Sequence, residues 1–139
     1  MNSVFDIAEF ILGELGEITT WKLQKLIYYC QAHYLGEKGK PLFKEEIEAW
    51  ANGPVCRPLY DKHRRLFTIK TIGGNTDKLL DSEKSFIRLI LEKYGAYSGD
   101  ALRDLTHTDE SWTKAREGLM PAERGNHAIR HEDLVAEYS

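Results

Sequence analysis

The sequence predicts a mainly α-helical fold: a compact single-domain helical bundle over residues 1–139, with a small two-stranded β element. Several segments carry apolar residues at helical spacing and begin at a residue suited to capping a helix. Alternation typical of strands is confined to two short stretches, and the chain shows no internal repeat or linker. Its 139 residues are near the commonest length of one domain.

Two helices are expected in the first forty residues. The first covers residues 4–15, where apolar side chains recur every three to four positions after Ser3, a suitable N-cap. The second begins at Thr19 or Thr20 and ends at Gly36 or Gly39.

The second of these helices is apolar on two faces. Its core stripe consists of Leu23, Leu26, Ile27, Cys30 and Tyr34. The roughly opposite face carries Trp21, Tyr28, Ala32 and Leu35. We therefore expect this helix either to be central in the domain or to bind a partner on its second face.

The middle of the chain predicts a minor β element. Residues 45–51 read as a short strand, in competition with one helical turn, and a turn at residues 52–54 follows. Residues 68–72 alternate as TIKTI and could pair with the segment around Ile47. Between them, the segment at 54–67 could form a helix with proline in its first turn and an apolar face made of Val55, Leu59, Leu66 and Phe67.

The remaining helices are expected in the C-terminal half. One follows Asp81 as N-cap and stops at Gly95, and a short one starts at Ser98 or Asp100. The stretch LTHTDESW then forms a loop, one further helical turn covers residues 112–117, and a final short helix covers residues 129–138.

Composition restricts the classes of function and the location. The net charge of −3 gives no overall attraction to nucleic acid, although a local basic patch remains compatible with it. Cys30 and Cys56 lie inside hydrophobic patterns, as expected of buried reduced thiols. The first residues lack the basic start of a signal peptide, and no apolar run could span a bilayer. We expect a cytoplasmic protein without membrane contact.

LTHTDESW places His107, Asp109 and Ser111 within five positions, the three residue types of a hydrolase triad. A triad normally assembles from separate segments around a nucleophile elbow and an oxyanion loop, and neither of these features is present. We interpret the stretch as a helix entry instead. Thr106 or Thr108 would cap a helix, His107 would bond to backbone, and Trp112 would fill the core.

A metal-dependent enzyme is an alternative, because His127 and His131 are four residues apart and Glu132 is adjacent. The segment lacks the HExxH order and a third ligand is not evident, so neither a metal nor another cofactor is expected. A DNA-binding regulator is a further alternative, since the first two helices and the basic run around Arg64 allow a helix-turn-helix interpretation.

Four stretches together resemble the Panacea domain of bacterial and phage antitoxins, also described as antitoxin SocA-like. They are TTWKLQKLIYYCQAHYL, PLFKEEIEAWANGPVCRPLY, LTHTDESW and the terminal helix after Ile129. The residues that mark the domain are Trp50, Gly53, Pro54, His107 and Trp112. In one departure from the pattern, Ser111 stands where proline more often precedes the tryptophan.

The resemblance implies a non-enzymatic antitoxin that neutralises a cognate toxin by direct protein binding, the toxin being encoded next to it. Some relatives act instead as adaptors that deliver the toxin to an ATP-dependent protease. A homo-oligomer is compatible with this role, and nucleic acid is not an expected partner.

Two hypotheses concern how the partner binds. In the first, the face with Trp21, Tyr28 and Leu35 either packs under the N-terminal helix or forms part of the toxin-binding surface. In the second, one basic surface complements an acidic toxin or occupies a nucleotide-binding groove on it. That surface would consist of Lys22, Lys25, Arg57, Arg64 and Arg65.

Overall fold

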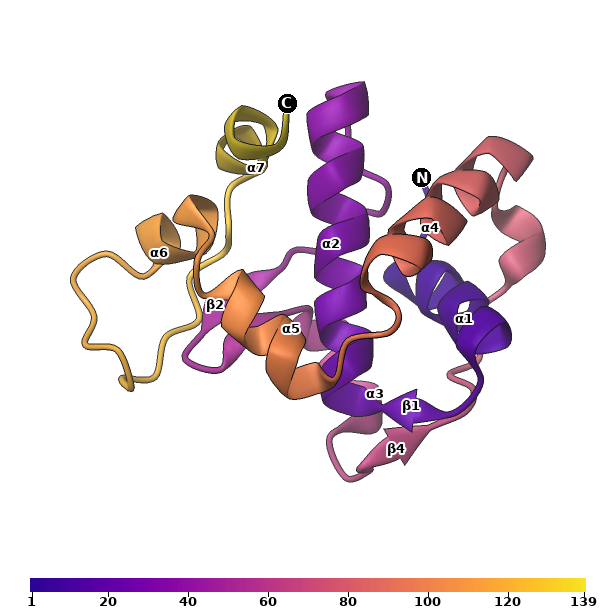
Figure 1. The fold of residues 1–139 in the computed structure, drawn as a ribbon, viewed down its shortest axis with the longest axis horizontal. Coiled ribbons are helices and arrows are strands. Elements are labelled where there is room, and N and C mark those ends of the chain that lie inside the picture. Colours follow the sequence, from indigo (N-terminus) through magenta and orange to yellow (C-terminus); the bar gives the residue numbers. More distant parts are fainter.

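The computed structural model describes all 139 residues and confirms a mainly α fold with minor β structure (Figure 1). The helices are α1 (Val4–Leu15), α2 (Thr20–Lys38), α3 (Arg57–His63), α4 (Asp81–Tyr94), α5 (Gly99–Thr106), α6 (Glu110–Ala115) and α7 (His131–Tyr138). A 3₁₀ turn, η1, covers Thr76–Lys78. The strands are β1 (Ile18–Thr19), β2 (Glu48–Trp50), β3 (Gly53–Val55) and β4 (Thr68–Ile69).

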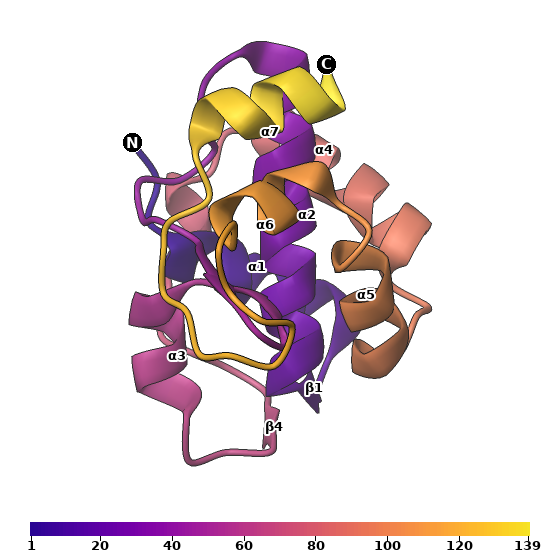
Figure 2. The same ribbon diagram turned by 90° about the vertical axis from the view of Figure 1, so that its left-hand side faces the viewer.

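Helix α2 lies at the centre of the fold. The other helices surround it, as the two views at right angles show (Figures 1 and 2). Both of its faces are buried, with Leu26 and Cys30 on one side and Tyr28 and Leu35 on the other. Of the two alternatives expected for a helix with two apolar faces, the structure shows the central position.

Local capping sets the helix ends. Ser3 caps α1 by accepting a hydrogen bond from the Phe5 amide, and Thr19 caps α2 by accepting one from the Lys22 amide. Helix α2 ends at Gly39, whose φ of 73° lies in the left-handed region that glycine adopts at low cost. Asp81 was expected to cap α4 but is its first helical residue. Leu80 takes the N-cap position, and its amide donates a hydrogen bond to the Glu83 side chain.

One strand pair is a local hairpin and the other joins distant parts of the chain, so the expected pairing of residues 68–72 with the segment around Ile47 is wrong. Strand β2 pairs antiparallel with β3, and β4 pairs antiparallel with β1. The first pair forms because Gly53, at a φ of 115°, lets the chain reverse directly after Trp50. Strand β4 is then left to bond with the link between α1 and α2.

Helix α3 carries Pro58 in its first turn, as expected. Of the apolar face predicted for residues 54–67, only Leu59 lies buried on α3: Val55 is buried in β3, whereas Leu66 is exposed and Phe67 is 77% exposed. The helix ends at His63, so Leu66 and Phe67 lie in the connection that leads into β4 and not on a helix face.

The C-terminal elements differ by a few residues from the expected boundaries. Helix α6 begins at Glu110, two residues earlier than expected, and α7 begins at His131, two residues later. The delay arises because residues 127–129 run beside β2: the Ala49 amide donates to the His127 carbonyl at 2.8 Å, and the Ile129 amide donates to the Ile47 carbonyl at 2.8 Å. This segment brings the loop before α7 next to the β2–β3 hairpin.

Both cysteine thiols are buried and unpaired. Burial raises the pKa of Cys56 to about 12 and also raises the pKa of Cys30. None of the helices is both long enough and apolar enough to cross a bilayer.

Replacing Gly53 by alanine should destabilise the protein by about 1–3 kcal/mol, because the backbone conformation disfavours a side chain and the new Cβ would lie 2.7 Å from Cε of Lys25. Urea denaturation measures this change. The matched control is Gly13→Ala in α1, where nothing lies within 4 Å of the added atom and the free energy of unfolding should rise slightly. Equal effects of the two substitutions would contradict the role assigned to Gly53.

Candidate functional site

Buried amide side chains of α2 hold two loops of the chain. The Gln24 side chain accepts a hydrogen bond from the Cys56 amide at 2.8 Å and donates one to the Cys56 carbonyl at 3.2 Å. Gln31 accepts from the Leu42 amide at 2.7 Å and donates to the Phe43 carbonyl at 3.0 Å. Each glutamine thus pairs with backbone as a strand would, which fixes both ends of the segment that carries the β2–β3 hairpin.

Lys25 lies between these two glutamines and reaches the hairpin. Its side chain is 1% exposed, and its ammonium donates to the Pro54 carbonyl at 3.3 Å. The nitrogen also lies 4.7 Å from the centre of the Trp21 ring. Burial, and secondly the positive charge of Arg103, lower the pKa of Lys25 to about 7.

Tyr28 binds the start of α6. Its hydroxyl donates to the Asp109 carboxylate, which also accepts the hydroxyl of Tyr138 at 2.5 Å. The hydroxyl of Ser111 lies 3.2 Å from that of Tyr28. Burial raises the pKa of Asp109, against the opposing effect of the two tyrosine hydrogen bonds. This carboxylate therefore ties α2, α6 and α7 together.

The capping predicted for LTHTDESW is wrong. The hydroxyls of Thr106 and Thr108 donate to carbonyls at the end of α5, at 2.7 Å in each case, so they do not cap the next helix. Asp109 is engaged with the two tyrosines, so the first amides of α6 need another acceptor. The Glu137 carboxylate of α7 accepts hydrogen bonds from the backbone amide of Glu110 at 2.7 Å and from that of Ser111 at 3.0 Å.

His107 stacks on Trp112, with ring centres 4.3 Å apart and planes 13° apart. Burial, followed by the charges of Arg103 and Lys25, lowers the pKa of His107, while the Asp104 carboxylate and the nearby Ala51 backbone raise it. The buried Nε2 of His107 has no hydrogen-bond partner, so the expected bond of this side chain to backbone is not confirmed, and the stacking on Trp112 was not expected.

The hydrolase trio does not assemble as a triad. Asp109 and Ser111 both contact the Tyr28 hydroxyl, whereas the ring of His107 stacks on Trp112. The metal candidates also separate, because His127 precedes α7 while His131 is its first residue. The two histidines therefore do not share a helix face, and no group of three or more metal-ligating side chains gathers elsewhere.

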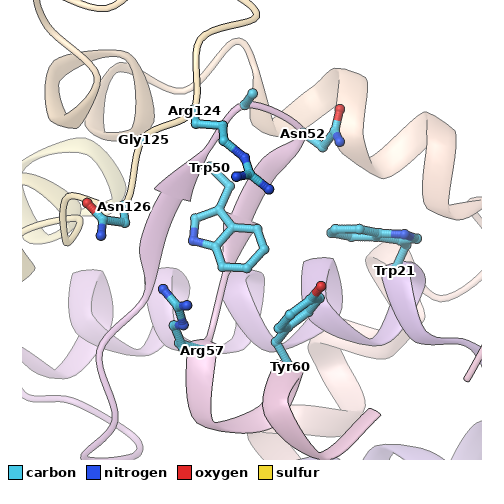
Figure 3. A pocket seen from close by; sticks show the side chains of 9 residues that line it. Trp21, Trp50, Asn52, Arg57, Tyr60, Arg124, Gly125 and Asn126 are labelled. Carbon is cyan, nitrogen blue, oxygen red and sulfur yellow. The ribbon is translucent and has the colours of Figure 1, made fainter. Parts of the chain in front are cut away.

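A cavity of about 600 Å³ opens beside the β2–β3 hairpin (Figure 3). Its side chains come from α2, the hairpin, α3 and the loop before α7, and they surround the indole of Trp50. Aromatic and cationic groups dominate this set, which consists of Trp21, Trp50, Ala51, Asn52, Arg57, Tyr60, Arg124, Gly125 and Asn126. Such a lining suits binding of a partner group by stacking and charge.

The structure separates the residues of the first partner-binding hypothesis. Trp21 is 37% exposed and lines the cavity, whereas Tyr28 and Leu35 are buried. Tyr28 faces Asp109 at the start of α6, so it does not pack under the N-terminal helix as one version of the hypothesis required. Of this face, only Trp21 is placed to meet a partner directly.

The five basic residues do not form one surface. Lys22 donates to the Gly95 carbonyl at 2.6 Å, and Lys25 is buried against the hairpin. Arg57 lines the cavity, while Arg64 and Arg65 are exposed beyond the end of α3.

The sequence did not point to Tyr60 or the segment 124–126 as lining residues, and Trp50 was expected only as a residue that marks the domain. The side chain of Trp50 is half-buried at the cavity, with its indole N–H donating to Glu48 at 2.8 Å. The one signal in the sequence that could have indicated this cavity is the spacing of Trp50, Arg57 and Tyr60, which lie on either side of a turn and on a short helix. Nothing local marks 124–126, because the backbone pairing of residues 127–129 with β2 brings them here.

Comparison with known proteins identifies the family. The model of the antitoxin SocA-like, Panacea domain family matches residues 23–113, so the chain belongs to that family. Antitoxin SocA of Caulobacter vibrioides (strain NA1000 / CB15N) is 42% identical over 43 residues, which cover 31% of this chain and 23% of that relative. No solved structure matches the chain significantly.

Replacing Lys25 by methionine should stabilise the protein at low pH. The folded-state pKa of Lys25, about 7, lies below the unfolded value of about 10.4, so a buried charge opposes folding fully below about pH 7. This penalty fades as the pH rises towards the unfolded pKa. After allowance for the lost hydrogen bond to Pro54, we expect the free energy of unfolding of Lys25→Met to exceed that of the wild type by about 2–3 kcal/mol near pH 6. The difference should vanish near pH 10.

Denaturation of both proteins across this pH range measures the gain. The matched control is Lys38→Met, at the exposed end of α2, which should show no such pH dependence. A loss of stability in Lys25→Met near pH 6 would contradict the assignment of Lys25 as a destabilising buried charge.

Proposed function

We propose that this protein is an antitoxin that neutralises a cognate toxin by binding it directly at the aromatic and basic cavity beside the β2–β3 hairpin. The observation that carries the proposal is the lining itself: two tryptophans, a tyrosine and two arginines around one opening of about 600 Å³. Tryptophan, tyrosine and arginine are the side chains most enriched among the residues that dominate the energy of protein interfaces.

The arginines of the cavity keep their charge available to a partner. Arg57 makes an ion pair with Glu48 at 3.7 Å, and its side chain is half-exposed. An exposed pair of this kind contributes at most about 1 kcal/mol, so Arg57 can exchange it for a carboxylate of a partner. Arg124 is exposed and makes no ion pair.

The hairpin that carries the cavity is held rigidly from behind. The Trp112 indole donates to the Trp50 carbonyl at 3.0 Å, and the Arg116 guanidinium donates to the Ala49 carbonyl at 2.9 Å. Because the backbone under Trp50 is already ordered, binding loses little conformational entropy there. A preorganised aromatic surface supports a binding role for this face.

The family and the relative named Antitoxin SocA support the antitoxin role. Delivery of the bound toxin to an ATP-dependent protease is the alternative mechanism. It differs in one observable: an adaptor lowers the amount of toxin in the cell, whereas direct neutralisation leaves the toxin present and bound.

Co-expression with the product of the adjacent reading frame tests the proposal. The wild-type chain should relieve the toxicity of that product, and Trp50→Ala or Arg57→Glu should weaken binding by about 10- to 100-fold, as expected for central interface residues. Titration calorimetry measures the affinity, and immunoblotting of the toxin distinguishes the two mechanisms.

Arg65→Glu is the matched control, because it reverses an exposed charge outside the cavity lining and should leave binding nearly unchanged. Toxicity that the wild-type chain does not relieve would contradict the antitoxin role. Relief that survives both cavity substitutions would place the interface elsewhere.

A further inference from the structure

A smaller cavity of about 150 Å³ adjoins the first. The two share Trp21 and Asn52, and the smaller one is also lined by Lys25, Gly99, Asp100 and Arg103. Its walls are therefore the first turns of α2, the hairpin turn and the start of α5. A volume of this size holds several water molecules at about 30 Å³ each, and hence a carboxylate group.

Lys25 is the unusual member of this lining. A lysine this deeply buried normally has an ionic partner, yet no carboxylate pairs with it. Its one hydrogen bond to protein, to the Pro54 carbonyl, is long at 3.3 Å. Two of its N–H groups therefore lack an acceptor in the chain, at a side chain that lines a cavity.

The chain's own acidic residues do not compensate this charge. The Asp100 side chain is 90% exposed and lies 3.9 Å from Arg103, and Arg103 also lies 3.4 Å from Asp104. Exposed pairs of this kind are weak, and neither aspartate pairs with Lys25. The inner wall of the cavity thus presents two basic side chains, one of which, Lys25, has no acidic partner.

We propose that Lys25 and Arg103 bind a carboxylate of an acidic segment of the partner protein, whose neighbouring side chains lie in the larger cavity between Trp21, Trp50 and Tyr60. This inference rests on the proposed function and assigns the chemistry of the partner. Charge complementarity selects the occupant: the combined lining of the two cavities contains Lys25, Arg57, Arg103 and Arg124 and a single carboxylate, that of Asp100.

Binding of a carboxylate should be coupled to proton uptake. The titratable groups around Lys25 are Arg103 and Asp100 of α5, His63 of α3 and His107 after α5. Burial lowers the pKa of both histidines, and Arg103 repels the ammonium. An arriving carboxylate would favour the protonated amine, so the pKa of Lys25 should rise from about 7 and a proton should be taken up above neutral pH.

The first experiment follows the Lys25 side chain by NMR in the full wild-type chain, with a hexaglutamate peptide as the probe and hexaglutamine as the uncharged control. We expect millimolar hexaglutamate to raise the titration midpoint of Lys25 by about one pH unit or more and hexaglutamine to leave it unchanged. A midpoint that hexaglutamate does not move, or that moves no more than that of the exposed Lys38, would overturn the proposal.

The second experiment compares Lys25→Met with Lys38→Met in neutralisation of the adjacent gene product. Methionine keeps the apolar stem, so Lys25→Met should remain folded while its affinity for the partner falls at least tenfold. The Lys38→Met control should bind as the wild type does. Full affinity in a folded Lys25→Met protein would overturn the role of Lys25 and leave the proposed function intact.

The two proposals can therefore fail separately. If the wild-type chain fails to neutralise, the proposed function is wrong, and the peptide titration still decides whether Lys25 binds a carboxylate.

Discussion

The fold depends on hydrogen bonds between buried side chains of α2 and the loops around it. Gln24 and Gln31 each bond an amide and a carbonyl of a loop, so they supply partners that neighbouring strands would otherwise provide. A buried hydrogen bond stabilises by only about 1 kcal/mol net, but removing one partner leaves a buried polar group that costs about 1–3 kcal/mol. The loops are therefore specified in position as well as stabilised.

The same helix connects this framework to the proposed binding face. Trp21 in its first turn lines both cavities, while Lys25 one turn later contacts the hairpin from within. A partner that contacts Trp21 consequently meets a side chain whose backbone is anchored by the core. This arrangement places exposed aromatic area on the central helix of the fold, which favours affinity because little order has to be gained on binding.

The sequence predicts the helices better than their surroundings for a physical reason. Caps such as Ser3 and Thr19 and the stop at Gly39 act within a few residues, so α1 and α2 have the expected bounds. The strand partner of residues 68–69 depends on where the link between α1 and α2 lies, which no local pattern encodes. Among the candidate site residues, Trp21 and Arg57 line the cavity, whereas Tyr28 is buried in the core and is not available to a partner.

Helix α7 has a consequence for how the family domain is delimited. The family match ends at residue 113, yet Glu137 supplies the acceptors for the first amides of α6, and Tyr138 shares the Asp109 carboxylate with Tyr28. A fragment cut to the matched residues would lose these partners, and it would also lose α1, which carries part of the same hydrophobic core. The region recognisable by similarity is thus smaller than the unit that folds. A fragment for structural or binding work should therefore keep both flanking helices.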